Sequence, residues 1–200
     1  MHAGRTPTDT TSPALTVGVV VGSLRRESVC RKLAAHAIRM APDSLRLEIL
    51  EIGDLPLYDE DLDAGPVPLS WQRFRDQVRS VDALLFVTPE YNRSVPAPLK
   101  NAVDVGSAPY GANVFAGRPA GIISLSPGRL GAFGANHHLR QSLVFLDVPA
   151  MAQPEAYFGD SHEMFDESGQ LASAAVEKLL GAYLESFEQW TRRHLRVAAR

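Results

Sequence analysis

The chain has 200 residues, of which 45% are apolar and 22% are charged, a balance that is ordinary for one soluble globular domain. A net charge of −3 gives no electrostatic reason to expect nucleic acid or an anionic membrane as a partner, and no apolar run is long enough for a membrane span. The single cysteine, Cys30, excludes an internal disulfide and a cysteine-rich metal site, and it favours a reducing, cytoplasmic location.

Strand-like and helix-like segments alternate along the chain. Residues 1–14 are mostly polar and rich in Thr, Ser and Pro, which predicts a disordered segment before a folded domain over 15–193. Residues 15–22 form a continuous, β-branched apolar run that is typical of a strand buried on both faces of a parallel sheet. A helix with apolar residues on one face is predicted over 28–40, and an alternating strand over 45–52.

The rest of the chain continues the alternation and ends in an amphipathic helix. The predicted elements are a helix over 69–81, a strand over 83–88, a helix over 97–105, a strand over 119–124, a helix over 136–146, a strand over 148–152 and a helix over 172–193. Residues 159–169 are polar and are predicted as a loop, and 194–200 as a C-terminal tail. Five short apolar strands separated by helices predict an α/β fold with a doubly wound parallel sheet.

The loop after the first strand, residues 22–28, leads directly into a helix. Ser23 and Ser28 offer hydroxyl groups, Arg25 or Arg26 offers a cation, and the helix start presents free N–H groups, which together suit one phosphate group. A plain turn with Ser28 as helix N-cap explains the same residues equally well. The loop lacks both G-x-x-x-x-G-K-[ST] and G-x-G-x-x-G, so a single phosphate, as in FMN, fits it better than a nucleoside triphosphate or a dinucleotide.

The loop after the third strand is the most informative segment of the chain. Its prolines, Pro89 among them, stiffen the backbone, so that its N–H and C=O groups can be held against a flat heterocycle. Tyr91 can add an aromatic wall, with Glu90 and Asn92 near the edge of the ring. The alternative is a proline-rich turn with Tyr91 packed into the core.

The two loops together resemble a known family. The motifs Gly22-Ser-Leu-Arg-x-x-Ser28 and Thr88-Pro-Glu-Tyr-Asn-x-Ser94-x-Pro96-x-x-Leu99-Lys-Asn-Ala102-x-Asp104 are similar to the NADPH-dependent FMN reductase family. The run Leu139-Arg-Gln-x-Leu143-Val-Phe-Leu-Asp147 resembles its bacterial NAD(P)H quinone and chromate reductase branch. The resemblance covers nearly the whole folded part and implies a flavodoxin-like five-stranded parallel sheet in the order 2-1-3-4-5, with helices on both faces.

The resemblance also implies a set of cofactor-binding residues. The phosphate of FMN would be bound by Ser23, Arg25 and Ser28, the isoalloxazine by Pro89, Glu90, Tyr91 and Asn92, and its other side by the loop after the fourth strand, with Ser126 and Gly128. The sequence departs from the family pattern at Cys30, where Asn is usual, and over residues 132–138, where a glycine pair and an Arg-containing helix start are usual.

The implied activity is transfer of hydride from NADPH or NADH to FMN, followed by reduction of a second acceptor in a ping-pong sequence. A quinone, a flavin, a metal oxyanion, an azo compound or a nitro compound would serve as acceptor. No side chain needs to act as acid, base or nucleophile, and the six histidines show no metal-ligand spacing, so we expect no catalytic residue and no metal.

Two other functions remain open at this point. One is a flavodoxin-like electron carrier without NAD(P)H oxidation of its own, and the other is a flavin-free α/β protein or hydrolase. Members that resemble this chain commonly assemble, so a homodimer or homotetramer is expected. Trp71, Phe74 and the helix over 139–145 are candidates for the interface, although the same residues would serve equally well as core.

Overall fold

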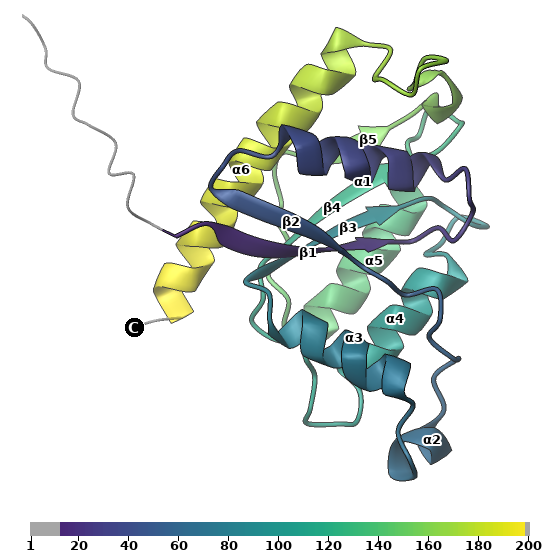
Figure 1. Cartoon of the computed structure of the whole chain (residues 1–200), viewed down its shortest axis with the longest axis vertical. Coiled ribbons are helices and arrows are strands. Elements are labelled where there is room, and N and C mark those ends of the chain that lie inside the picture. The colour runs from purple at the N-terminus through teal and green to yellow at the C-terminus, as the bar shows by residue number, and fades with distance from the viewer. Residues whose placement is uncertain (1–12, 199–200) are drawn as a thin grey trace, which may run out of the picture.

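Five parallel strands form one sheet in the order β2-β1-β3-β4-β5 in the computed structural model, which describes residues 13–198 (Figure 1). The strands are β1 (Leu15–Val21), β2 (Leu45–Leu50), β3 (Ala83–Thr88), β4 (Ala120–Leu125) and β5 (Ala156–Phe158). Val19 of β1 lies between Ile49 of β2 and Leu85 of β3. The predicted fold class and strand order are confirmed, whereas the predicted N-terminal segment, 1–14, lies almost wholly outside the described residues.

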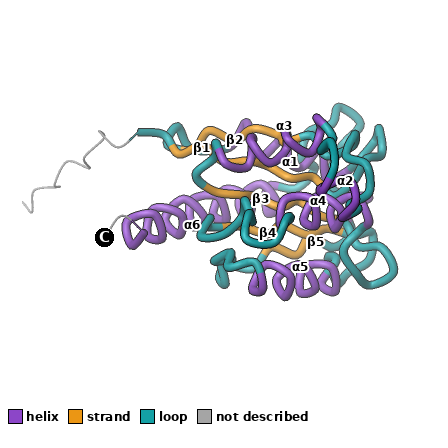
Figure 2. The backbone as a smooth tube through the Cα atoms, turned by 90° about the horizontal axis from the view of Figure 1, so that it is seen from below, coloured by secondary structure: helices purple, strands orange, loops and turns teal. Residues whose placement is uncertain are grey.

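Helices cover both faces of the sheet. They are α1 (Val29–Met40), α2 (Glu60–Ala64), α3 (Leu69–Arg79), α4 (Ala97–Ser107), α5 (Phe133–Phe145), the 3₁₀ helix η1 (Ser161–Glu163) and α6 (Ala174–Ala198). Helices α1 and α6 lie on one face of the sheet and α3, α4 and α5 on the other (Figures 1 and 2), and one core cluster joins the sheet to each group of helices. No helix in this described part of the chain is long and apolar enough to cross a membrane.

The three central strands explain the apolar runs of the sequence. All six residues of β3 and all six of β4 are buried, because helices cover both of their faces. Trp71 and Phe74, two of the interface candidates, are fully buried on α3 and belong to the core. They are therefore not available for contact with a second chain.

The fifth strand lies later in the chain than the sequence predicts. The predicted strand over 148–152 forms only one bridge, between Ala150 and Ala120, and pairing with β4 resumes at Ala156. Pro149 and Pro154 have no N–H to donate to a strand ladder, so this stretch cannot pair continuously. The prediction of a strand over 148–152 is therefore wrong.

A tyrosine of α6 takes the place of the missing strand partner. Ile122 of β4 donates its N–H to the hydroxyl of Tyr183, with an N···O distance of 2.7 Å, and the same hydroxyl donates to Ile122 O at 3.1 Å. Both residues are buried. Burial raises the pKa of the Tyr183 hydroxyl, so it stays protonated and can fill both roles.

Other differences concern the ends of helices. Helix α5 begins at Phe133 rather than at Asn136, and α2 was not predicted. The last helix continues to Ala198, five residues beyond the predicted end at Arg193, so most of the predicted tail over 194–200 is helical. The extension includes Leu195 and Arg196, two residues with high helix propensity, which favour continuation of the helix.

The substitution Tyr183→Phe should lower the free energy of unfolding by about 2–4 kcal/mol, because it leaves two buried backbone groups without a partner. Urea denaturation followed by circular dichroism measures this. Tyr110→Phe is the matched control, since the Tyr110 side chain is fully exposed and its hydroxyl should contribute nothing. A loss of unfolding free energy below about 1 kcal/mol for Tyr183→Phe would show that the hydroxyl contributes little as a partner of Ile122.

Candidate functional site

The loops that follow β1, β3 and β4 meet at the carboxyl edge of the sheet, on the right in Figure 1. Together with the segment after β5 they enclose a cavity of about 90 Å³. It is lined by Ser23, Arg25, Ser28, Val29, Cys30, Pro89, Tyr91, Leu125, Pro127 and Ser161. The carboxyl edge of an open parallel sheet is where such folds bind ligands.

The β1–α1 loop supplies most of the polar groups. Ser28 is the N-cap of α1, and its Oγ accepts a hydrogen bond from the Arg31 N–H at 3.2 Å. That bond uses an oxygen lone pair and leaves the hydroxyl proton free to donate to a ligand. The N-cap and the phosphate-binding interpretations of Ser28 are therefore compatible.

Gly22 allows the β1–α1 loop to approach the loop after β3. A Cβ atom at this position would lie 3.0 Å from Thr88 Oγ1 and 3.3 Å from Pro89 Cδ, which is tighter than ordinary contact. The two halves of the cavity wall can therefore meet without a side chain between them. Cys30, next to the cavity, is buried, and burial raises the pKa of its thiol to about 12, so the thiol stays neutral.

The β3–α4 loop contains a tight reversal that positions Tyr91. The backbones of Tyr91 and Ser94 exchange two hydrogen bonds of 3.1 and 3.0 Å. Asn92 and Arg93 between them have φ angles of 51° and 62°, as in a type I′ turn. Asn tolerates this left-handed region, whereas Arg is strained there by roughly 1–3 kcal/mol, which points to a functional reason for the reversal.

The Glu90 carboxylate points at the start of α5 rather than into the cavity. Its Oε2 accepts a hydrogen bond from the Ala135 N–H at 3.0 Å, and its Oε1 lies 3.4 Å from Arg93 Nη1. The residue at the N-cap position of α5, Ala132, has no side chain that could cap the helix. Glu90 therefore caps α5 from a different loop and adds a negative charge where the helix dipole favours one.

The β4–α5 loop owes its shape to Ser126 and Gly131. The Ser126 hydroxyl donates to Gly128 O at 3.0 Å and accepts from the Ala132 N–H at 3.1 Å. Gly131 has a φ of 56°, and a Cβ there would lie 2.7 Å from Phe158 N, so only glycine fits. These contacts leave Pro127, between Ser126 and Gly128, to line the cavity.

A chain of buried side chains supports the same loop from the core. Ser124 Oγ donates to Gly131 O at 2.8 Å, and Asn136 Nδ2 donates to Ser124 Oγ at 3.1 Å. Arg140 Nε then donates to Asn136 Oδ1 at 2.9 Å. Because Ser124 and Asn136 are fully buried, these bonds fix the loop in one position relative to the sheet.

The structure brings only part of the predicted site into the cavity wall. Ser23, Arg25, Ser28, Pro89 and Tyr91 line the cavity, whereas Glu90, Asn92, Ser126 and Gly128 lie around it. Leu125 and Pro127 also line it and belong to the stretch over 124–131 that the family resemblance implies, whereas Val29 and Ser161 line it without having been predicted. Ser161 could not be found from a motif, because it follows the strand that the sequence placed too early.

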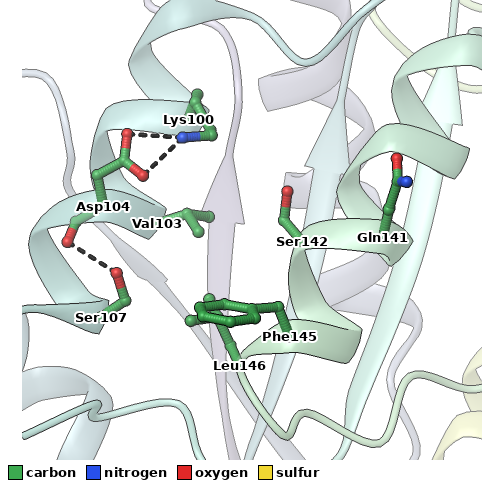
Figure 3. Close-up of a pocket in the computed structure, with 8 residues that line it drawn as sticks. All are labelled: Lys100, Val103, Asp104, Ser107, Gln141, Ser142, Phe145 and Leu146. Atoms are coloured by element: carbon green, nitrogen blue, oxygen red, sulfur yellow. Dashed lines mark hydrogen bonds and ion pairs between the residues drawn. The ribbon is translucent and has the colours of Figure 1, made fainter. Parts of the chain in front are cut away.

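A second hollow of about 360 Å³ lies between α4 and α5 (Figure 3). Its charged groups are already paired, since Lys100 Nζ lies 2.6 Å from Asp104 Oδ1. Phe145 and Leu146 form its apolar side, and 85% of Phe145 is exposed. This hollow presents apolar surface rather than free donors, so it does not resemble the cavity at the carboxyl edge.

The donors of the carboxyl-edge cavity fit the phosphate end of FMN. The buried hydroxyls of Ser23 and Ser28, the cationic Arg25 and the start of α1 are the groups that bind phosphate in proteins. The cavity is too small for a whole flavin, because pockets for ligands of that size measure roughly 300–1,000 Å³. The ring would therefore lie at the mouth, beside Pro89, Tyr91 and Pro127.

The family model described as NADPH-dependent FMN reductase matches residues 15–163. The chain belongs to this family. It is 54% identical over 181 residues to a quinone reductase of Pseudomonas putida, an alignment that covers 90% of this chain and 97% of that protein. It is 40% identical over 179 residues to a 2-hydroxy-1,4-benzoquinone reductase of a Burkholderia species, with coverage of 90% and 97%.

A solved structure gives the same result. FerB, a flavoenzyme NAD(P)H:(acceptor) oxidoreductase from Paracoccus denitrificans, matches with a TM-score of 0.84 at 39% identity, over 90% of this chain and 99% of that one. As a member of the FMN reductase family, the protein is an oxidoreductase that uses FMN and NAD(P)H. The family, the enzyme class and the cofactors expected from the motifs are confirmed, which favours the reductase over the electron carrier and the hydrolase.

The substitution Glu90→Ala should lower the free energy of unfolding by about 1 kcal/mol, because it removes the cap and the charge at the start of α5. Glu90→Gln keeps an oxygen acceptor and should lose less, so it serves as the control. Urea denaturation and FMN titration are measured on both variants. Normal stability combined with strongly weakened FMN binding would mean that the carboxylate contacts the flavin instead of the helix.

Proposed function

We propose that this enzyme passes electrons from NAD(P)H through FMN to a quinone in a ping-pong sequence. The observation that carries the proposal is the cavity at the carboxyl edge, where phosphate-binding donors lie beside a stiff loop with an aromatic wall. When bound, FMN supplies the redox chemistry by accepting hydride from the reduced nicotinamide and passing electrons on. The protein binds and orients the flavin.

In this proposal each loop contacts a different part of FMN. Ser23, Arg25 and Ser28 bind the phosphate, Pro89, Glu90, Tyr91 and Asn92 border the isoalloxazine, and the loop with Ser126 and Gly128 closes its other side. Glu90 contributes through its backbone, because its carboxylate is engaged by α5. With FMN held in this way, the loops would leave one face of the ring open for donor and acceptor to use in turn, which is the arrangement that a ping-pong sequence requires.

The names of the relatives support a quinone as the acceptor. Both curated relatives described above are quinone reductases, one of them for 2-hydroxy-1,4-benzoquinone. The proposal ranks quinones above free flavins, metal oxyanions, azo compounds and nitro compounds. The proposed location is the cytoplasm, where a single free cysteine such as Cys30 is ordinary.

Stopped-flow absorbance tests the proposed function. NADPH, added without oxygen to the FMN-loaded protein, should bleach the flavin, and a benzoquinone should restore its colour. Steady-state rates should give parallel double-reciprocal lines, with kcat/KM for the quinone at least about tenfold above that for the other acceptor classes, a difference of roughly 1.4 kcal/mol. A flavin that neither NADPH nor NADH reduces would indicate a carrier, and a better acceptor of another class would overturn the quinone assignment.

We also propose that two copies of the chain associate through the face formed by α4 and α5. Val144 and Phe145 of α5 are 77% and 85% exposed, whereas Leu139 and Leu143 of the same helix are buried in the core. A helix with apolar residues on opposite sides is typical of one that is covered on both. The hollow beside Phe145 could accept a side chain from a second copy (Figure 3).

The substitution Phe145→Lys should reduce the assembly to half its mass or less in sedimentation velocity, because it places a charge in an apolar contact. Leu69→Lys is the matched control, since Leu69 is an 81% exposed apolar residue on α3, away from this face. The control should keep the wild-type mass. An unchanged mass for Phe145→Lys, or the same loss in both variants, would contradict the proposed interface.

A further inference from the structure

The segment between β5 and α6 returns from the edge of the sheet to α1 and closes the cavity. Near its start, the Ser161 N–H donates to Ser126 O at 3.1 Å, which ties it to the β4–α5 loop. Farther on, His36 Nε2 of α1 lies 2.9 Å from Gly169 O and donates its hydrogen to that carbonyl. The segment is therefore held at two points and forms the wall opposite the β1–α1 loop.

Ser161 is the polar side chain that this wall contributes. The residue is 5% exposed and lines the cavity together with Ser23, Arg25 and Ser28. Within residues 13–198, no protein group is hydrogen-bonded to its hydroxyl, and this oxygen is not one of the fully buried polar atoms without a partner, so it is accessible from the cavity. A hydroxyl that lines a cavity of phosphate-binding donors, and that no protein group engages, is available to donate to a ligand in that cavity.

The opposite wall is short of one strong donor. Cys30 lies next to Ser28 in the wall, and its thiol is a weak hydrogen-bond donor compared with a hydroxyl or an amide. Burial keeps this thiol neutral, so it adds neither a charge nor a strong bond. A bound phosphate has three terminal oxygens, which accept hydrogen bonds from more than one side.

We propose that Ser161 is a further FMN-binding residue, and that its hydroxyl donates a hydrogen bond to the phosphate. The contact comes from the β5–α6 segment and supplies the donor that Cys30 lacks. This inference rests on the proposed phosphate site of Ser23, Arg25 and Ser28. It assigns a cofactor contact to a segment that lies outside the motifs of the sequence.

Titration of the full-length apoprotein with FMN and with riboflavin, which has no phosphate, tests the inference. Flavin fluorescence gives both dissociation constants. Ser161→Ala should weaken FMN binding about tenfold or more, the size expected for a hydrogen bond to a charged group, and change riboflavin binding less than about twofold. Unchanged FMN affinity, or equal weakening of both flavins, would overturn the assignment.

Three further variants make the result specific. Ser168→Ala removes a hydroxyl from the same segment that donates to Asp166 Oδ1 at 2.7 Å on the surface, and it should leave FMN affinity unchanged. Ser161→Cys keeps a side chain of similar size but only a weak donor, and it should weaken FMN as Ser161→Ala does, which shows that the loss comes from the hydroxyl rather than from side-chain volume. Cys30→Asn in the Ser161→Ala background should recover part of the affinity.

Arg25→Ala separates this inference from the proposed site. It should also weaken FMN binding about tenfold or more and spare riboflavin. If Arg25→Ala weakens FMN while Ser161→Ala does not, only the role of Ser161 is refuted. If neither variant weakens FMN, the phosphate site itself is elsewhere.

Discussion

Helices on both faces of β1, β3 and β4 determine where this molecule can bind a cofactor. Most side chains of these strands belong to two apolar core clusters, and the hydroxyls of Thr88 and Ser124 are hydrogen-bonded within the protein, so the strands offer few polar groups to a ligand. Donors must come from the loops beyond the carboxyl ends, which the parallel register brings to one edge. That is why Ser23, Tyr91 and Ser161, far apart in the sequence, line one cavity.

The same burial explains how much could be predicted from the sequence. Strands with two covered faces are continuous apolar runs, so β1, β3 and β4 were predictable, and with them the loops that carry Ser28 and Tyr91. The fifth strand was misplaced, because the apolar run over 148–152 makes only one bridge to β4, and the contact of Ile122 with the Tyr183 hydroxyl that replaces further pairing is one that no local pattern encodes. Because the fifth strand was predicted too early in the chain, Ser161 was not recognised as a residue that follows a strand at the carboxyl edge.

Several motif residues have a structural role beside the one that the family motif suggests. The carboxylate of Glu90 caps α5, and Ser126 and Gly131 shape their own loop. A sequence motif gives the identity of a residue but not the direction of its side chain. For Glu90, that direction depends on the packing of α5 against the β3–α4 loop. One residue of a motif can therefore contribute to stability while its neighbour contributes to ligand binding.

The burial of Cys30 has a chemical consequence for the proposed reduction of quinones. Quinones are electrophiles that alkylate sulfur, and the thiolate is the reactive form. Because burial raises the pKa of the Cys30 thiol to about 12, the thiol stays protonated at neutral pH, and the residue itself is buried. Cys30 therefore offers a quinone almost no nucleophilic sulfur, so the protein would resist alkylation at this position by the acceptor that we propose.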